Sequence, residues 1–201
     1  MKRIGKGFLL ALTALLLTAV LTLAATAQTY GGIYDKTVRL HVLADSDEPA
    51  AQALKLKVRD ALIVYLESEL TECSDRAHAE ERIIDRIPQM EELAKQTLLK
   101  EGCAQPVKIT LEKEDYPRRV YEAFSFPAGC YTSLRVFIGS GQGQNWWCVV
   151  YPPLCLNASL ANEHLEGYSN EEQALLTQKN GGYKLRFAIL ELGAYLKDLF
   201  L

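Results

Sequence analysis

The residues best suited to catalysis or metal binding lie close together near the N-terminal third of the chain. His41, Asp45 and Asp47 fall within a short stretch. One imidazole and two carboxylates can bind a small cation or activate water. The spacing is not that of a helical His-Glu-x-x-His site, and such Asp residues more often cap helices while such a His packs within a strand. We expect no metal and no cofactor, and retain a peptidoglycan hydrolase using these three residues as an alternative function.

A glycine-rich segment at 139–145 invites a phosphate-binding interpretation. A dinucleotide fingerprint beginning at Gly139 or Gly141 needs glycine at position 144 or 146, where Gln144 and Trp146 stand. The segment also joins two predicted strands and leads into no helix, so we expect a flexible hairpin tip. No Gly-x-Ser-x-Gly nucleophile motif is present in the sequence. The sequence therefore predicts a protein that is not an enzyme.

Five cysteines leave at least one thiol unpaired in a monomer. Cys148 and Cys155 flank a Pro-Pro bend that can bring them together. Cys103 and Cys130 each precede a predicted strand, so a second bridge can join them and leave Cys73 single. The alternative is that several of these side chains are small buried apolar groups.

Both tryptophans of the chain lie side by side in the segment NWWCVVYPPLC, residues 145–155. Neighbouring strand residues point to opposite faces, so only one of Trp146 and Trp147 can enter a given core. The other is covered by another element or offered to a partner, and aromatic, proline-rich surfaces often anchor protein recognition. The predicted partner-binding residues are Asn145, Trp146, Trp147, Tyr151, Pro152 and Pro153. A carbohydrate-binding module with Trp147 and Tyr151 as stacking platforms is a further alternative.

The elements that must position these residues follow from periodicity. Residues 37–44 alternate as a strand, and the acids and Pro49 after it are typical of a helix start, with apolar residues at helical spacing to about residue 70. A second helix is predicted over 74–100, kinked or broken near Pro88 and ended by Gly102. We expect the two helices to pack as an antiparallel pair on one face of the sheet.

The period then changes from helical to alternating. Strands are predicted at 107–111, 120–126, 131–138 and 145–151, and their short connections indicate an antiparallel meander. Residues 156–182 are polar, with one short helix starting near residue 170, and a final amphipathic helix is predicted over 183–199. The predicted fold is α+β: a mostly antiparallel sheet of about four to five strands with helices packed on it.

An export leader precedes this domain. Lys2, Arg3 and Lys6 come before an uncharged apolar run over 8–23, and Ala25-Thr26-Ala27 is suited to a signal peptidase. We expect residues 1–27 to be a signal peptide cut after Ala27 or an uncut membrane anchor, with 28–201 a single domain. The chain has 22 Lys and Arg against 25 Asp and Glu, and the leader holds three of the bases, so the remaining charge is −6. That balance excludes nucleic acid as an expected partner.

Two blocks of the sequence resemble a known family. RLHVLADSDEPAAQALKLKVRDAL (39–62) and FPAGCYTSLRVFIGSGQGQNWWCVVYPPLC (126–155) are similar to signatures of stage II sporulation protein R. Two positions depart from the pattern: Asp45 stands where Asn is expected, and Cys130 where Glu is usual, which suggests a lineage-specific bridge to Cys103. The signature residues are Arg39, His41, Asp45, Ser46, Asp47, Lys55, Lys57, Arg59, Asp60 and Arg135.

The resemblance implies a signalling protein of endospore-forming bacteria. Members are made in the forespore and exported into the space between the two membranes. There they trigger a membrane-bound aspartic protease of the mother cell, stage II sporulation protein GA, which processes the precursor of sigma factor E. The implied partners are therefore that protease and, through the N-terminal segment before cleavage, a membrane.

Overall fold

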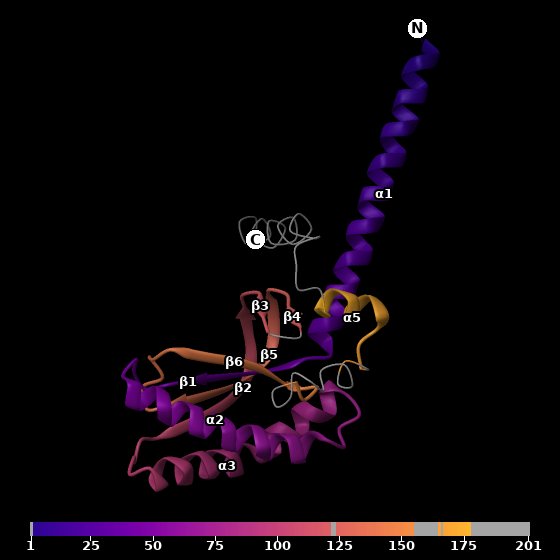
Figure 1. Cartoon of the computed structure of the whole chain (residues 1–201). Helices are drawn as coiled ribbons and strands as arrows, with labels where there is room; N and C mark the ends of the chain where they lie inside the picture. The colour runs from indigo at the N-terminus through magenta and orange to yellow at the C-terminus, as the bar shows by residue number, and fades with distance from the viewer. Residues whose placement is uncertain (1, 122–123, 155–164, 166, 178–201) are drawn as a thin grey trace.

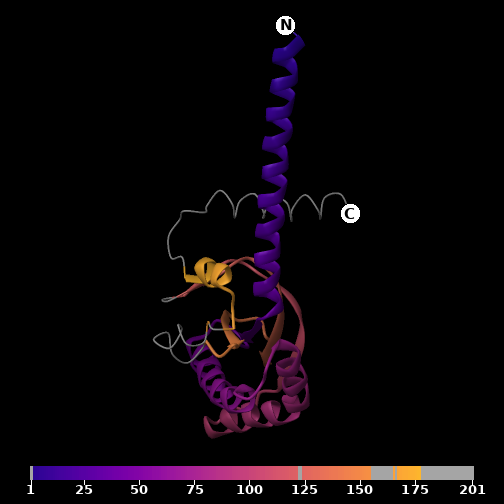
Figure 2. The ribbon, with the colours of Figure 1, turned by 90° about the vertical axis from the view of Figure 1, so that its right-hand side faces the viewer.

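The computed structural model describes residues 2–121, 124–154, 165 and 167–177. A long N-terminal helix rises from one side of an α+β domain, and its outer part contacts no other described element (Figures 1 and 2). In chain order the elements are α1 Lys2–Asp35, β1 Val38–Leu43, α2 Pro49–Leu70, α3 Arg76–Lys100, β2 Val107–Tyr116, β3 Arg119–Val120, β4 Ser125–Phe126, β5 Gly129–Ile138, β6 Asn145–Tyr151 and α5 Asn170–Thr177.

The main sheet has four strands in the order β2-β5-β1-β6. Its β2–β5 and β1–β6 pairs are antiparallel, as expected, but β1 runs parallel to β5. The predicted meander is therefore wrong, since β1 lies between β5 and β6. All six residues of β1 are buried, which is typical of a central strand covered on both faces. Local sequence patterns could not show that β1, which lies far before β5 and β6 in the chain, takes the place between them in the sheet.

The predicted strand over 120–126 is also wrong. The structure has two short strands there, β3 and β4, which form a separate two-stranded ribbon. The amide of Tyr121 donates a 2.8 Å hydrogen bond to the carbonyl of Phe124. The aromatic residues of this ribbon pack over the main sheet instead of extending it.

Helices α2 and α3 pack together on one face of the sheet, as predicted (Figure 1). The first core joins Val38, Leu40 and Val42 of β1 to Leu62 of α2 and Ile83 of α3. Burial of such aliphatic side chains stabilises the fold by about 1.5–3 kcal/mol each.

Helix ends differ in part from the expectation. The α2 N-cap is Glu48, which makes no side-chain capping bond, so the predicted capping by Asp45 or Asp47 is wrong. In α3, Asp75 caps the start by accepting a hydrogen bond from the amide of His78. Gly102 ends α3 with a φ of 76°, as predicted.

Of the kink or break predicted near Pro88, the break does not occur, and the kink stays a prediction. Helix α3 is continuous from Arg76 to Lys100 with Pro88 inside it. Proline removes one helical donor and leaves the carbonyl four residues earlier unpaired. That carbonyl belongs to Ile84, whose side chain is exposed, so water can hydrate this side of the helix.

The opposite sheet face, called here the second sheet face, is covered over part of its area by an aromatic core. The last turns of α1, the β3–β4 ribbon and α5 meet there. Ile33 at the end of α1 is fully buried and Tyr30 is 5% exposed, so the helix passes position 27 and ends inside the domain. Helix α5 begins at Asn170, as predicted. The predicted helix over 183–199 lies outside the described residues.

Candidate functional site

Arg39 is the centre of the second sheet face and is completely buried. Its Nε donates to the carbonyl of Cys148 at 3.1 Å, and its Nη2 donates to the hydroxyl of Tyr121 at 2.8 Å. Its guanidinium carbon lies 4.4 Å from the ring centre of Tyr116 and 5.1 Å from that of Tyr131. Burial raises the pKa of both phenols, so they stay neutral. The buried cation is therefore stabilised by ring faces and neutral acceptors, and its Nη1 has no hydrogen-bond partner among the described residues.

The rings of Tyr116, Tyr121 and Tyr131 around Arg39 are called here the aromatic cage. A chain of polar side chains runs beside it. His41 Nδ1 lies 2.8 Å from Glu114 Oε1, and the other oxygen of Glu114 accepts a 2.7 Å bond from Ser133. The Ser133 hydroxyl is also 2.7 Å from that of Tyr116. The Nε of Arg135 lies 3.4 Å from Glu114 Oε1. The carboxylate of Glu114 on β2 thus contacts three neighbouring polar groups, one on β1 and two on β5.

This chain contains serine, histidine and glutamate but not in a nucleophilic arrangement. In such sites the histidine lies between the acid and the serine. Here the carboxylate lies between His41 and Ser133, and Ser133 is fully buried. In the part of the chain that the structure describes, His41 Nε2 has no hydrogen-bond partner. The geometry supports an internal structural network and gives the serine no general base.

The metal and hydrolase alternative depends on His41 acting with Asp45 and Asp47, and the structure does not bring these three together. His41 faces Glu114 on the sheet, whereas both aspartates bind the loop after β5. Within the described ranges, no group of three or more His, Cys, Asp or Glu side chains is placed to hold a metal ion.

Asp45 and Asp47 hold the glycine-rich loop, here named the signature loop and comprising residues 139–144. Asp45 Oδ1 accepts from the amide of Ser140 at 2.6 Å, which lowers the pKa of Asp45. Asp47 Oδ1 accepts from the amide of Gln144 at 2.7 Å. Lys55 donates to the Gln144 carbonyl at 2.8 Å. The two signature blocks found in the sequence are therefore in direct contact.

Close approach explains the glycines of this loop. A Cβ on Gly143 would lie 2.3 Å from the carbonyl oxygen of Ser46, and Gly139 has a φ of 59° beside Asp45. The loop joins β5 to β6 across β1, so the predicted hairpin tip is wrong. Its backbone amides bind this chain's own carboxylates.

The two tryptophans lie on opposite sides of the edge strand β6, and each is half-buried. Trp146 packs against the first core, with the guanidinium carbon of Arg59 4.7 Å from its ring centre. Trp147 stacks on His41 at 5.2 Å, and the Arg119 guanidinium lies 3.5 Å over its ring. Each tryptophan thus carries an arginine at the sheet edge. We call this surface the β6 edge patch. Its five residues are the exposed Asn145, together with Trp146, Trp147, Arg59 and Arg119.

The rest of the predicted partner-binding segment lies at the far end of β6. Tyr151 donates to the carbonyl of Cys73 at 3.1 Å, and a cis peptide bond joins it to Pro152. Pro153 follows in a turn and is half-buried. Tyr151 and Trp147 do not form one flat platform, and Trp147 is already stacked on His41 and covered by Arg119. The carbohydrate-stacking alternative therefore gains no support.

The remaining signature residues are mainly surface ion pairs. Lys57 pairs with Glu101 and Arg59 with Asp60, while Arg135 pairs with Glu112 at 2.7 Å.

The structure tests one of the two predicted disulfide bridges, the one between Cys103 and Cys130. Cys73, Cys103 and Cys130 are free thiols. The register pairs Val107 with Ile138 and Asp115 with Cys130, so Cys103 and Cys130 lie at opposite ends of β2, roughly 27 Å apart. The predicted 103–130 bridge is wrong. Cys148 is disulfide-bonded, and Cys155 lies outside the described residues, so the 148–155 pairing stays a prediction.

Several members of this site are not predicted from the sequence. Glu114, Tyr116, Arg119, Tyr121 and Ser133 were not singled out. The sequence carries a signal for two of them. Side chains alternate along β2, so Glu114 and Tyr116 lie on the face opposite to Leu111, which is the second sheet face. The contribution of Arg119 and Tyr121 depends on how the β3–β4 ribbon folds back, which no periodicity reports.

Together these features define an α+β domain carried on one N-terminal helix that is long and apolar enough to cross a membrane. Between Gly7 and Asp35 that helix contains an 18-residue window with a mean hydropathy of 2.5, which suits a signal or anchor segment. The chain belongs to the stage II sporulation protein R family, whose model matches residues 34–161.

A curated relative supports the same assignment. The chain is 35% identical over 123 residues to stage II sporulation protein R of Bacillus subtilis (strain 168). The match covers 61% of this chain and 55% of the relative, so the chain spans about half the length of that protein. No solved structure matches significantly.

Proposed function

We propose that this chain is an exported sporulation signal that activates a membrane-bound aspartic protease, stage II sporulation protein GA, by binding it. The activated protease then processes the precursor of sigma factor E, coupling the forespore to gene expression in the mother cell. The domain acts in the space between the two membranes, delivered there by its N-terminal helix. The covalent chemistry belongs to the protease.

One observation supports this proposal most strongly: the β6 edge patch. Tryptophan and arginine are enriched at the energetic centres of protein interfaces. Here Trp146 with Arg59 and Trp147 with Arg119 place both residue types together at one sheet edge, half-buried and rigidly supported. The polar groups behind the patch, by contrast, bind one another.

The mechanism would be a shift of population. A ligand favours one state of its partner only to the extent that it binds that state better. Binding through the β6 edge patch would thus stabilise the active conformation, or the active dimer, of the protease. No bond in either protein needs to be made or broken by this chain.

Co-expression in a non-sporulating host tests the proposal. The full chain, the protease and the sigma precursor are produced together, and precursor cleavage is scored on immunoblots. We expect cleavage only when all three are present, and its loss in a Trp146→Ala/Trp147→Ala variant that remains folded. Arg86→Ala is the matched control, because Arg86 lies on α3 and pairs with Glu69 away from the patch. Normal cleavage with the folded double variant would exclude the patch as the contact.

A further inference from the structure

A pocket of about 220 Å³ lies where the end of α1 meets the start of α3 and the end of β6. Asp35 and Lys36 line it from the α1 end, Asp75 and Arg76 from α3, and Tyr151 from β6. Tyr168 closes a further wall. The space suits one long side chain and is too small for a helix or strand.

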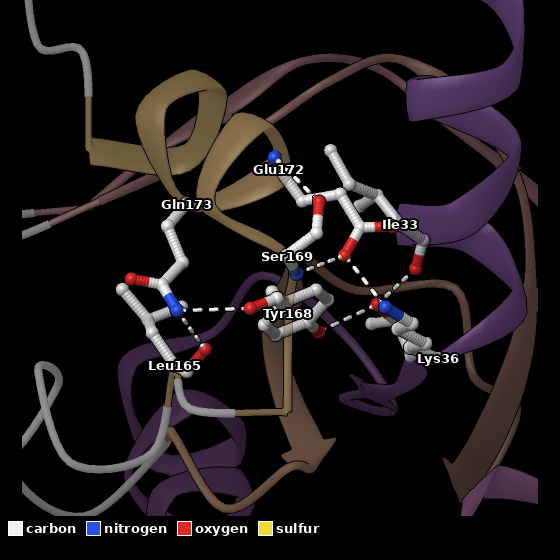
Figure 3. Close-up of polar contacts among 8 residues, drawn as sticks. Ile33, Lys36, Leu165, Tyr168, Ser169, Glu172 and Gln173 are labelled. Carbon is white, nitrogen blue, oxygen red and sulfur yellow. Dashed lines mark hydrogen bonds and ion pairs between the residues drawn. The ribbon is translucent and has the colours of Figure 1, made fainter.

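The two bases of this pocket are already neutralised. Lys36 Nζ lies 2.7 Å from Glu172 Oε2, an ion pair with a carboxylate that is itself buried (Figure 3). Arg76 Nη1 lies 3.5 Å from Glu80 Oε1 and 3.2 Å from the hydroxyl of Thr132. Both cations thus point to partners outside the pocket.

The two acids of the pocket are less compensated. Asp75 accepts from the His78 amide and from Ser74, and these bonds lower its pKa, so it stays ionised. Its charge is opposed by the positive end of α3, worth roughly half a unit charge. Asp35 has no ion pair among the described residues, and its side chain is exposed to solvent. The four ionised side chains of the pocket sum to zero, but both cations are paired with carboxylates outside it, so Asp35 is left as a negative charge without an ion-pair partner among the described residues.

We propose that this pocket receives a lysine or arginine side chain of the partner polypeptide. An ammonium or guanidinium group would pair with Asp35 and pack against the rings of Tyr151 and Tyr168, as cations do on aromatic faces. The hydroxyls of both tyrosines are occupied within the protein, by the Cys73 carbonyl and by Thr37, so the rings are held in place.

This inference rests on the proposed function and extends it to a second contact. Every residue of the pocket named here follows position 27, so a domain released by cleavage after Ala27 retains it. Asp35, Lys36, Asp75, Arg76 and Tyr151 all lie within the region matched by the family. A site with a single charge contact gives specificity to a larger interface, while the β6 edge patch supplies apolar area.

A binding experiment tests the pocket directly. The ¹⁵N-labelled full chain in dodecyl maltoside micelles, which carry no cationic group, is titrated with N-acetyl-arginine amide, and amide shifts of Ser74, Asp75 and Gly167 are followed. We expect saturable shifts, absent with N-acetyl-norleucine amide, and affinity reduced about two- to fivefold in Asp35→Asn, as for a half-exposed ion pair. Asp85→Asn, an exposed α3 change outside the pocket, should bind as the unchanged chain. Absence of saturable shifts, or equal affinity in Asp35→Asn, overturns the proposal.

Two further arms separate the possible sources of the cation and the two proposals. If phosphatidylethanolamine nanodiscs abolish binding of the arginine amide, a lipid ammonium occupies the pocket and the partner assignment is overturned. In the co-expression assay, Asp35→Asn should lower precursor cleavage whereas Asp85→Asn should not. Full cleavage with Asp35→Asn overturns this inference alone. No cleavage with the unchanged chain overturns the proposed function instead, while the titration still reports on the cation site.

Discussion

His41 Nδ1 lies 2.8 Å from Glu114 Oε1, joining the central strand to an edge strand across the second sheet face. The same carboxylate accepts from Ser133 and lies near Arg135, so its removal leaves buried donors unpaired. We predict that Glu114→Ala lowers the free energy of unfolding by about 2 kcal/mol, because unsatisfied buried polar groups cost that much. Urea denaturation measures this. Glu112→Ala, which removes the exposed partner of Arg135, should cost less than about 0.5 kcal/mol. Equal losses in the two variants would contradict the network.

Arg39 gives the second prediction. Its fork-shaped guanidinium bonds Cys148 and Tyr121 at once and lies against several rings. Lysine keeps the charge but not the planar fork, so Arg39→Lys should destabilise the domain by about 2 kcal/mol or more. The comparison is Arg59→Lys, a change at an outer arginine that should stay within about 0.5 kcal/mol. Denaturation midpoints of the two variants that coincide would rule out a special role for the cage.

The signature loop gives the third prediction. Gly143→Ala places a methyl group 2.3 Å from the Ser46 carbonyl oxygen. The nearest atoms belong to the Ser46 backbone, which cannot turn away as a flexible side chain could. We expect a loss of about 1–3 kcal/mol from the forced displacement. Gly167→Ala is the control, because a Cβ there meets nothing within 4 Å. Thermal unfolding of both variants checks the difference, and an unaffected Gly143→Ala would mean that the loop does not lie against Ser46.

Acid stability gives the fourth prediction. The pKa of Asp45 is lowered below its ordinary 3.8 by the Ser140 amide first, and by the Ser140 and Gln105 side chains. A depressed folded pKa contributes stability that is complete above the unfolded pKa and is lost as the pH falls through the folded one. The unchanged protein should therefore lose more stability as the pH falls below about 4 than Asp45→Asn, which keeps an acceptor without the charge. Parallel pH profiles in urea denaturation would contradict this role of Asp45.

Thiol chemistry gives the fifth prediction. Cys73, Cys103 and Cys130 should be alkylated in denaturant without reductant, whereas Cys148 should need reduction first. Mass mapping of the alkylated peptides checks this assignment and identifies the partner of Cys148. Recovery of a peptide pair linking Cys103 to Cys130 would contradict the register of β2 on β5.

The sequence predicted helices α2, α3 and α5, most strands and the fold class, because these depend on local periodicity. Alternation of Val38, Leu40 and Val42 marked a strand, and helical spacing marked α2 and α3. The order of strands was not predictable, since the central position of β1 depends on long-range pairing with β5. Arg39 and His41 sit at alternating positions between buried aliphatic residues, a pattern that in retrospect places them on one face.

The candidate site was predicted only in part for the same reason. The adjacent tryptophans were identified from composition alone, and their separation onto two faces followed from strand geometry. Their arginine neighbours Arg59 and Arg119 come from two other elements, so they required the tertiary structure. Asp45 and Asp47 are typical of a helix start, but their carboxylates accept hydrogen bonds from the loop amides of Ser140 and Gln144. They therefore do not cap the first amides of α2.

The most direct test of the central claim, activation by binding, is the stoichiometry of activation. Purified full-length chain in nanodiscs is titrated into a fixed amount of reconstituted protease, and the initial rate of sigma precursor cleavage is measured. Activation by binding predicts a rate that rises with added chain and reaches a plateau near a fixed molar ratio to the protease. Full activation by a small fraction of an equivalent, persisting after the chain is removed, would show turnover by this protein and contradict the account.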